Sequence, residues 1–128
     1  MAASYTYIDP AELVTLLDDE EKGGKVAIVD CRDDDRGDGF IVGSIHFPST
    51  TQSEARFAEL ATSLAQEGKT IIVFHCALSQ VRGPKGANRF ASALRVQGMT
   101  SPVVHVLRGG WENFCALYGE SRPDLMSE

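Results

Sequence analysis

The chain has 128 residues, of which 43% are hydrophobic and 23% are charged, and its formal net charge is −6. This size and composition predict one globular domain, spanning residues 1–128, with a single core. The acidic charge and scattered Lys and Arg residues argue against nucleic-acid binding, no apolar run reaches the length of a membrane span, and residues 1–7 lack a signal-peptide pattern. We therefore expect a cytoplasmic protein that does not bind a membrane.

The N-terminal part of the chain predicts a strand followed by a helix. Residues 5–8 form a short β-prone run. The Asp-Pro-Ala-Glu sequence at positions 9–12 is typical of a helix start, with Asp at the N-cap, Pro at N1 and Glu at N3. An apolar stripe follows, made by Leu13, Leu16 and Leu17. The two glycines and the charged residues of positions 20–24 end this helix.

The apolar run at residues 26–29 predicts a buried parallel strand that ends in Asp30, Cys31 and Arg32. Ligands bind at the carboxyl edge of open α/β sheets, so we expect Cys31 and Cys76 to end neighbouring strands on the same side. Adjacent strands lie roughly 4.8 Å apart and disulfides join Cα atoms about 4.4 to 6.8 Å apart, which sterically allows a bridge. Cys31 is therefore either a redox partner of Cys76 or a residue that only packs the strand end.

A polar loop and a second helix come next. Residues 33–39 carry Asp at four positions, and they form either a solvated loop or a wall beside an anion site that offers a general acid, with no carboxylate singled out. Residues 43–48 predict a short strand ended by proline, in which His46 is structural. Residues 52–67 predict a core-facing amphipathic helix. Its apolar positions are Phe57, Leu60, Ala61 and Leu64.

The central feature of the sequence is a strand, a loop and a helix. The apolar run at residues 71–74 predicts the strand, and the loop begins with Cys76 and reaches Arg82 after five intervening residues. Apolar residues at helical spacing then predict a helix that ends near Gly98. Backbone N–H groups that curl at a helix N-terminus bind anions, and the helix dipole favours negative charge there. The sequence thus predicts an oxyanion loop that begins with a thiol.

Each residue of this loop has an expected role. Cys76 is the candidate nucleophile, because the positive field of the loop favours the reactive thiolate. Arg82 offers planar, bidentate donors that match a tetrahedral oxyanion better than a lysine does. Backbone amides complete the site, at Ala77, Leu78, Ser79, Gln80, Val81 and Arg82. His75 is expected to support the loop through a hydrogen bond. A purely structural, buried Cys76 is disfavoured by the polar loop that follows it.

The C-terminal part predicts a last strand at residues 103–107, a tight turn at 108–110 and a closing helix at 112–118. Trp111 is expected at the start of this helix, and Phe114 and Leu117 on its apolar side. The three cysteines are widely spaced and form no cluster with histidine, so we expect no metal site. Cys115 is expected to be a filler in the core.

This order of strands and helices, with its Cys-x5-Arg loop, resembles the rhodanese-like fold, in particular its cell-division-cycle twenty-five phosphatase branch. Four segments carry the resemblance: Asp30-Cys31-Arg32, Gly43-Ser44-Ile45, His75-Cys76 through Arg82-Gly83-Pro84, and Leu107-Arg108-Gly109-Gly110-Trp111. It implies an α/β fold with a five-stranded, mostly parallel sheet flanked by helices on both faces, and Cys76 on the loop after the central strand. It also implies that Cys31 is the cysteine that traps the oxidised nucleophile as a disulfide.

The sequence of the loop indicates which group of proteins within this fold the chain resembles most. Sulfurtransferase rhodaneses carry a loop one residue shorter, and cell-cycle phosphatases commonly have acidic residues where this chain has Ala77 and Val81. This loop and the segment 83–90 are most similar to small eukaryotic arsenate/antimonate reductases of the protozoan type. The resemblance implies a thiol-dependent reductase of arsenate and antimonate with side activity on phosphate esters. It also implies no bound cofactor, glutathione as reductant, and glutaredoxin or thioredoxin as partner. The alternative is a protein tyrosine or dual-specificity phosphatase, which needs an acid among residues 33–38.

Overall fold

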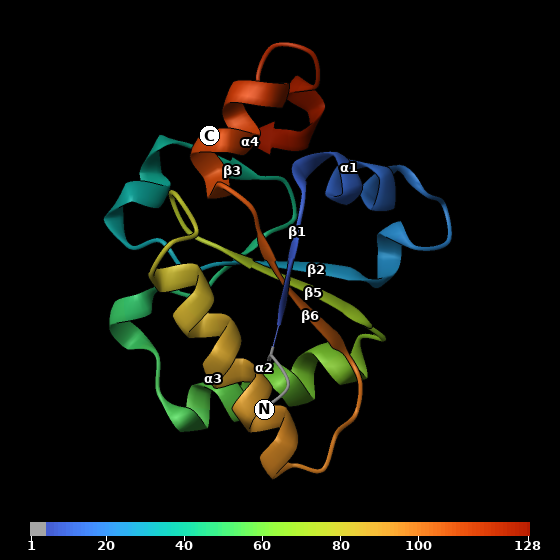
Figure 1. Cartoon of the computed structure of the whole chain (residues 1–128), viewed down its shortest axis with the longest axis vertical. Coiled ribbons are helices and arrows are strands. Elements are labelled where there is room, and N and C mark those ends of the chain that lie inside the picture. Colours follow the sequence, from blue (N-terminus) through green and yellow to red (C-terminus); the bar gives the residue numbers. More distant parts are fainter. Residues whose placement is uncertain (1–4) are drawn as a thin grey trace.

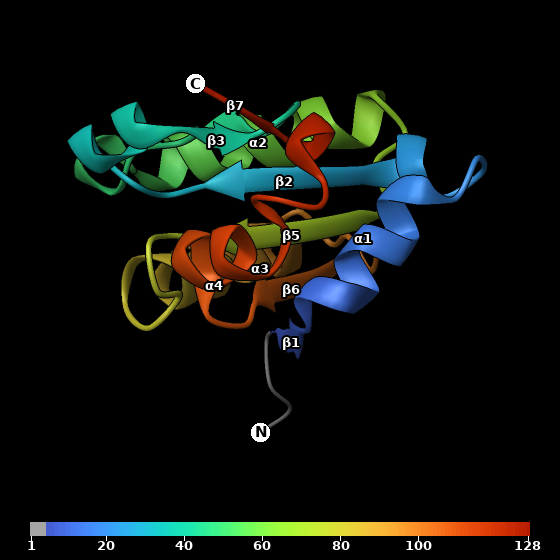
Figure 2. The same ribbon diagram turned by 90° about the horizontal axis from the view of Figure 1, so that it is seen from above.

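Five parallel strands form the central sheet of the computed structural model, which describes residues 5–128. Residues 1–4 lie outside the described residues. They belong to the segment 1–7, whose sequence lacks a signal-peptide pattern. The strands are β1 (Thr6–Ile8), β2 (Val26–Asp30), β4 (Ile45–His46), β5 (Ile71–His75) and β6 (Val103–Leu107). Their order is β1-β6-β5-β2-β4, and every neighbouring pair is parallel (Figures 1 and 2). The expected five-stranded sheet, with β5 at its centre, is therefore confirmed.

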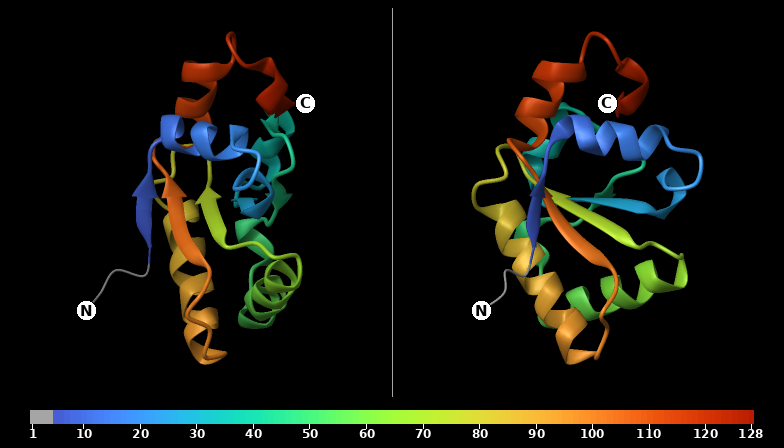
Figure 3. Two further views of the ribbon diagram at one scale, coloured as in Figure 1. Left: turned by 90° about the vertical axis from the view of Figure 1, so that its right-hand side faces the viewer. Right: turned by 45° about the vertical axis from the view of Figure 1, so that its right-hand side comes forward.

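Helices cover both faces of the sheet, as expected. Helices α2 (Glu54–Gln66) and α3 (Arg82–Val96) pack on one face, and α1 (Pro10–Asp18) and α4 (Gly110–Tyr118) pack on the other (Figure 3). Successive strand residues point to opposite faces, so Ala27 and Val29 join the cluster under α2 and α3, whereas Val26 and Ile28 join the other. Helices cover both faces of β2 and β5, which explains why the sequences of these two strands are continuous apolar runs.

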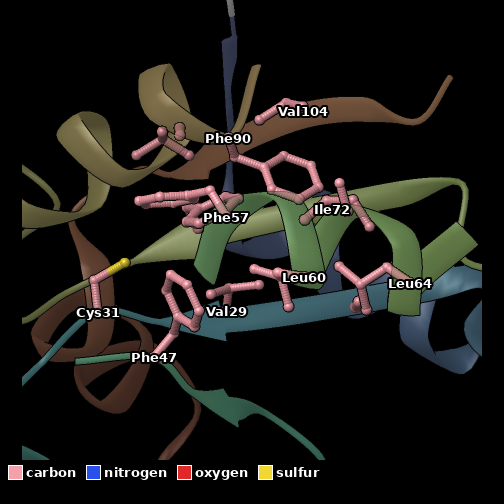
Figure 4. Packing of buried hydrophobic residues seen from close by; sticks show 14 of the residues in the cluster. Val29, Cys31, Phe47, Phe57, Leu60, Leu64, Ile72, Phe90 and Val104 are labelled. Carbon is pink, nitrogen blue, oxygen red and sulfur yellow. The ribbon is translucent and has the colours of Figure 1, made fainter. Parts of the chain in front are cut away.

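The core between the sheet and helices α2 and α3 reaches the carboxyl edge of the sheet. The four apolar residues predicted for α2 are all buried in it, and burying a large apolar side chain stabilises the fold by about 1.5–3 kcal/mol. Cys31 and Phe47 lie at one end of this cluster and Leu64 at the other (Figure 4). Cys76 belongs to the same cluster, so the core directly supports the loop that begins there.

The last helix differs from its prediction in two ways. It begins at Gly110, two residues earlier than expected, and Leu117 is 55% exposed, so placing Leu117 on its apolar side was wrong. The side of α4 that faces the core runs through Trp111, Phe114 and Tyr118, at i, i+3 and i+7 spacing. Leu117 lies outside this narrow stripe.

A small second sheet and short 3-10 segments complete the fold. Strand β3 (Phe40–Ile41) pairs with β7 (Met126–Ser127) in antiparallel fashion, a contact the sequence did not predict because two-residue strands have no detectable periodicity. The 3-10 segments are η1 (Gly23–Lys25), η2 (Asp34–Asp38), η3 (Ser49–Thr51) and η4 (Pro123–Leu125). Within residues 5–128, no helix combines the length and the apolar character needed to cross a membrane.

Candidate active site

The thiol of Cys76 lies directly against the N-terminus of helix α3. The loop leaves β5 at the carboxyl edge of the sheet, beside the end of β2 (Figure 2), and α3 begins at Arg82. The N-cap residue of this helix, Val81, provides no side-chain cap. Instead, the backbone N–H of Gly83 donates a hydrogen bond to Cys76 Sγ at 3.3 Å. The sulfur thus lies in the positive field of the helix N-terminus, and Cys76 is only 3% exposed.

Helix α4 holds the first half of the loop. The N–H groups of Trp111 and Glu112 donate to the carbonyl oxygens of Cys76 and Ala77, both at 3.0 Å. The C=O and N–H of a trans peptide point in opposite directions, so the N–H groups that follow these carbonyls, those of Ala77 and Leu78, turn away from α4. The start of α4 therefore determines how the loop presents its amides.

The second half of the loop contains a strained residue. Ser79 has a φ of 54°, is 3% exposed, and its hydroxyl has no hydrogen-bond partner within the described part of the chain. A left-handed residue in a tight loop lets successive N–H groups converge, as in anion-binding nests. Leu78 and Val81 are 52% and 70% exposed, and Gln80 is also exposed, so these three residues offer the inside of the loop only their backbone.

Two aspartates from the loop after β2 bind Arg82, which sequence reasoning missed. Arg82 Nη1 and Nη2 donate to Asp35 Oδ1 and Oδ2 at 2.9 and 2.7 Å, and Nη1 also lies 3.4 Å from Asp33 Oδ2. The hydrogen bonds from Arg82 lower the pKa of Asp35 to about 2, and Asp35 in turn raises the pKa of Arg82. Burial acts to raise the pKa of Asp33, but hydrogen bonds from Ser49 and Thr50 lower it. Both carboxylates are ionised near neutral pH, where neither can donate a proton.

His75 and Cys31 lie behind the loop. The ring Nδ1 of His75 is 3.1 Å from the carbonyl oxygen of Cys76, and complete burial lowers the pKa of this histidine, so its ring is neutral near pH 7. The Cys31 N–H donates to the His75 carbonyl oxygen at 2.8 Å. Burial raises the pKa of Cys31 to about 12, and both Cys31 and Cys76 are free thiols. Cys31 is therefore a protonated thiol directly after β2, the strand that pairs with β5.

A buried ion pair joins three of the segments around the site. Arg32 donates to Asp30 at 2.8 Å through Nη2 and to the carbonyl oxygen of Gly39 at 2.6 Å, and its guanidinium lies 4.8 Å from the ring centroid of Trp111. Arg32 and Asp30 are at most 1% exposed. Since a buried charge left without its partner is costly, this pair fixes the end of β2 against η2 and α4.

We expect the substitution Gly110→Ala to destabilise the protein by about 2–4 kcal/mol. Gly110 has a φ of 63°, and a Cβ there would lie 2.5 Å from the Cys76 carbonyl oxygen and 2.7 Å from that of Ala77. The new methyl group would push α4 off the loop. Urea unfolding measures the loss. The matched control is Gly24→Ala, where nothing lies within 4 Å of the added Cβ, and an equal effect of both variants would contradict the prediction.

The site brings a buried thiol, a helix N-terminus and an arginine together in one loop, an arrangement suited to binding a tetrahedral oxyanion and attacking its central atom. Within residues 5–128, no group of three or more His, Cys, Asp and Glu side chains is placed to hold a metal ion.

Comparisons with known proteins agree with this geometry. The family model for the rhodanese-like domain matches residues 9–117. The chain is 55% identical to the As-Sb reductase from Leishmania major, whose structure superposes with a TM-score of 0.93 over 95% of this chain and 84% of that one. It is 41% identical to Arsenate reductase 2.2 from Oryza sativa subsp. japonica, covering 88% and 85% of the two chains. It is 37% identical to Dual specificity phosphatase Cdc25 from Arabidopsis thaliana, covering 88% and 76%. The chain therefore belongs to the rhodanese-like domain family.

Proposed function

We propose that this protein is a thiol-dependent reductase of arsenate and antimonate with a phosphatase side activity. The observation that carries the proposal is the contact of Cys76 Sγ with the Gly83 N–H, at 3.3 Å, in a loop closed by Arg82. The similarity to proteins named arsenate reductase and As-Sb reductase supports arsenic and antimony oxyanions as substrates. The loop residues 77–81 include no carboxylate that would repel such an anion.

In the proposed mechanism, the Cys76 thiolate attacks the arsenic atom of arsenate, an S–As bond forms, and one arsenate hydroxyl takes a proton from solvent and leaves as water. Arg82 and the amides of residues 77–82 hold the remaining oxygens. A glutathione thiolate then attacks Cys76 Sγ. The S–As bond breaks, and its electron pair leaves with arsenic, which is reduced from As(V) to As(III). Glutaredoxin or thioredoxin reduces the resulting mixed disulfide, which requires a reducing compartment such as the cytosol.

The alternative is a protein tyrosine or dual-specificity phosphatase, which the Arabidopsis relative's name favours. An alkoxide leaving group needs a proton donor, and Asp33 and Asp35 are held ionised by their hydrogen bonds. Arsenate loses an oxygen as water, and solvent can supply the proton for this step, so a site without a carboxylic acid is better suited to arsenate than to alkyl phosphate esters. Aryl phosphates release a stabilised phenolate and remain suitable side substrates, and phosphotyrosine belongs to this class, so the missing acid counts against phosphoserine and phosphothreonine only.

The test of this proposal is an assay of arsenate-dependent NADPH oxidation with glutathione, glutaredoxin and glutathione reductase, run beside p-nitrophenyl phosphate hydrolysis. We expect arsenate and antimonate reduction to exceed hydrolysis in kcat/KM, and the rate to fall when glutathione is omitted. Replacing the glutaredoxin system by a thioredoxin system identifies the protein partner. Hydrolysis without measurable reduction would replace this proposal by the phosphatase alternative.

We also propose that Cys31 is the redox partner that protects Cys76. Peroxide oxidises the Cys76 thiolate to a sulfenic acid, and attack by the Cys31 thiol expels water and forms a disulfide. Several observations support the pairing. The two cysteines follow the paired residues Asp30 and His75 on adjacent strands and share one buried cluster. Gly86 of α3 leaves room beside Cys31, because a Cβ there would lie 2.9 Å from its sulfur.

We expect Cys31→Ser to prevent recovery from peroxide. After hydrogen peroxide and then dithiothreitol, the wild type should regain most of its own untreated activity and Cys31→Ser only a small fraction, because an untrapped sulfenic acid oxidises further. Cys115→Ser is the control, since Cys115 lies on α4 outside this cluster. Full recovery of the Cys31 variant would leave Cys31 with only a packing role.

A further inference from the structure

Among the described residues, hydrogen-bond partners of the Arg82 guanidinium lie along one of its two bidentate edges. A guanidinium has five N–H donors in a plane. Asp35 accepts from Nη1 and Nη2, and Asp33 lies within reach of the second Nη1 hydrogen. These contacts leave the Nε hydrogen and the second Nη2 hydrogen, which together form the other edge. An oxyanion can bind that edge through two parallel hydrogen bonds while both aspartates stay in place.

The two carboxylates are themselves held in place. The Ser49 hydroxyl donates to Asp33 Oδ2 at 2.6 Å, and the N–H and hydroxyl of Thr50 donate to Asp33 Oδ1 at 3.0 and 3.1 Å. The Asp33 N–H donates to Asp35 Oδ1 at 2.9 Å. The acceptors of Arg82 are therefore anchored on η3 and on the loop after β2. Fixed acceptors impose a fixed plane on the guanidinium.

The same contacts change the charge that a substrate meets. Arg82 contributes +1 and the two aspartates contribute −2, so the three side chains together carry −1. The thiols of Cys76 and Cys31 also lie within electrostatic range of Arg82, and the Cys31 thiol is uncharged. A second negative charge on the ligand is repelled by both carboxylates at close range. Arg82 therefore donates hydrogen bonds well, but the cluster that it forms with the two aspartates attracts a negatively charged ligand only weakly.

We propose that Asp33 and Asp35 are positioning residues that present the Nε–Nη2 edge of Arg82 to the oxyanion and make the site select singly charged over doubly charged oxyanions. The inference rests on the proposed function and deepens it. The singly charged forms of arsenate and antimonate are then the preferred substrates. Doubly charged phosphate monoesters bind less well, in line with a side activity.

The test is an NMR titration of the reduced 128-residue chain with sulfate and with perchlorate. Both anions are tetrahedral, with fixed charges of −2 and −1 near neutral pH. We expect the amides of residues 77–82 and the Arg82 Nε–H to shift with one midpoint. Asp35→Asn removes the charge but keeps one side-chain oxygen that can accept from Arg82. Sulfate affinity should therefore rise roughly tenfold and perchlorate affinity roughly threefold, because the repulsion removed scales with ligand charge. The control is Asp34→Asn, which removes the same charge from the exposed carboxylate between the two, and should change both affinities less than about twofold.

Four results would overturn the inference. If Asp34→Asn and Asp35→Asn changed the anion affinities equally, the overall negative charge of the region would set these affinities, and not the two carboxylates that bind Arg82. A sulfate-to-perchlorate affinity ratio that does not change in Asp35→Asn would exclude charge selection. An Arg82 Nε–H that stays fixed while the loop amides shift, or a loop to which neither anion binds, would exclude the edge assignment. None of these readouts uses catalysis, so a failure of arsenate reduction would count against the proposed function alone.

Discussion

Cys76→Ser is expected to reduce arsenate-dependent NADPH oxidation by a factor on the order of 10⁴ or more, which is the size of loss seen when a catalytic nucleophile is removed. The serine hydroxyl retains the small volume at this buried position, but it is neither ionised near neutral pH nor able to form the S–As bond that transfers the electron pair. The coupled assay and p-nitrophenyl phosphate hydrolysis should both fall to background, because they share the attacking thiolate.

The control for this variant is Cys115→Ser, which changes a half-buried thiol on α4. It should keep both activities within about twofold of the wild type. Circular dichroism and thermal unfolding establish that the Cys76 variant is folded. Reductase activity that survived in folded Cys76→Ser would remove Cys76 as the nucleophile and, with it, the proposed mechanism.

Arg82→Lys is expected to lower kcat/KM for arsenate by roughly 10²- to 10³-fold. A lysine ammonium retains the charge, but it cannot bind Asp35 through two parallel hydrogen bonds and an oxyanion through two more. The loss should appear mainly in kcat, because orientation matters most as charge moves in the transition state. Steady-state kinetics over a range of arsenate concentrations separate kcat from KM.

Arg95→Lys is the matched control, since Arg95 lies in the last turn of the same helix and its guanidinium donates a hydrogen bond to the Ser92 hydroxyl at 3.0 Å, far from the loop in sequence. It should leave kcat/KM within about twofold. If Arg82→Lys were equally mild, charge alone would explain the role of this residue, and the bidentate geometry would not matter.

The fold and the anion loop could be predicted because their signals are local. Strand β5, the loop and helix α3 are contiguous, so an apolar run, a Cys-x5-Arg segment and helical spacing were enough to place Cys76 and Arg82 at a helix N-terminus. The capping pattern at positions 9–12 likewise located the start of α1, where the Asp9 N–H lies 3.4 Å from Glu12 Oε1. These signals depend on neighbours within one or two turns.

The surroundings of the loop could not be predicted in the same way. Asp33 and Asp35 lie 49 and 47 residues before Arg82 in the sequence, and the only signal was that they follow a strand that ends at the ligand-binding edge. The early start of α4 at Gly110 was also missed, because a glycine with a φ of 63° followed by Trp is not a usual helix start.

By itself, the sequence determined the class of fold, the position of the thiol and the arginine, and the chemistry that they suit. The tertiary structure alone decided that Asp33 and Asp35 bind Arg82 as ionised carboxylates and that α4 orients the loop carbonyls of Cys76 and Ala77. Periodicity and capping act over a few residues, whereas the protonation state and partner of a carboxylate depend on which distant groups the sheet brings within hydrogen-bonding distance.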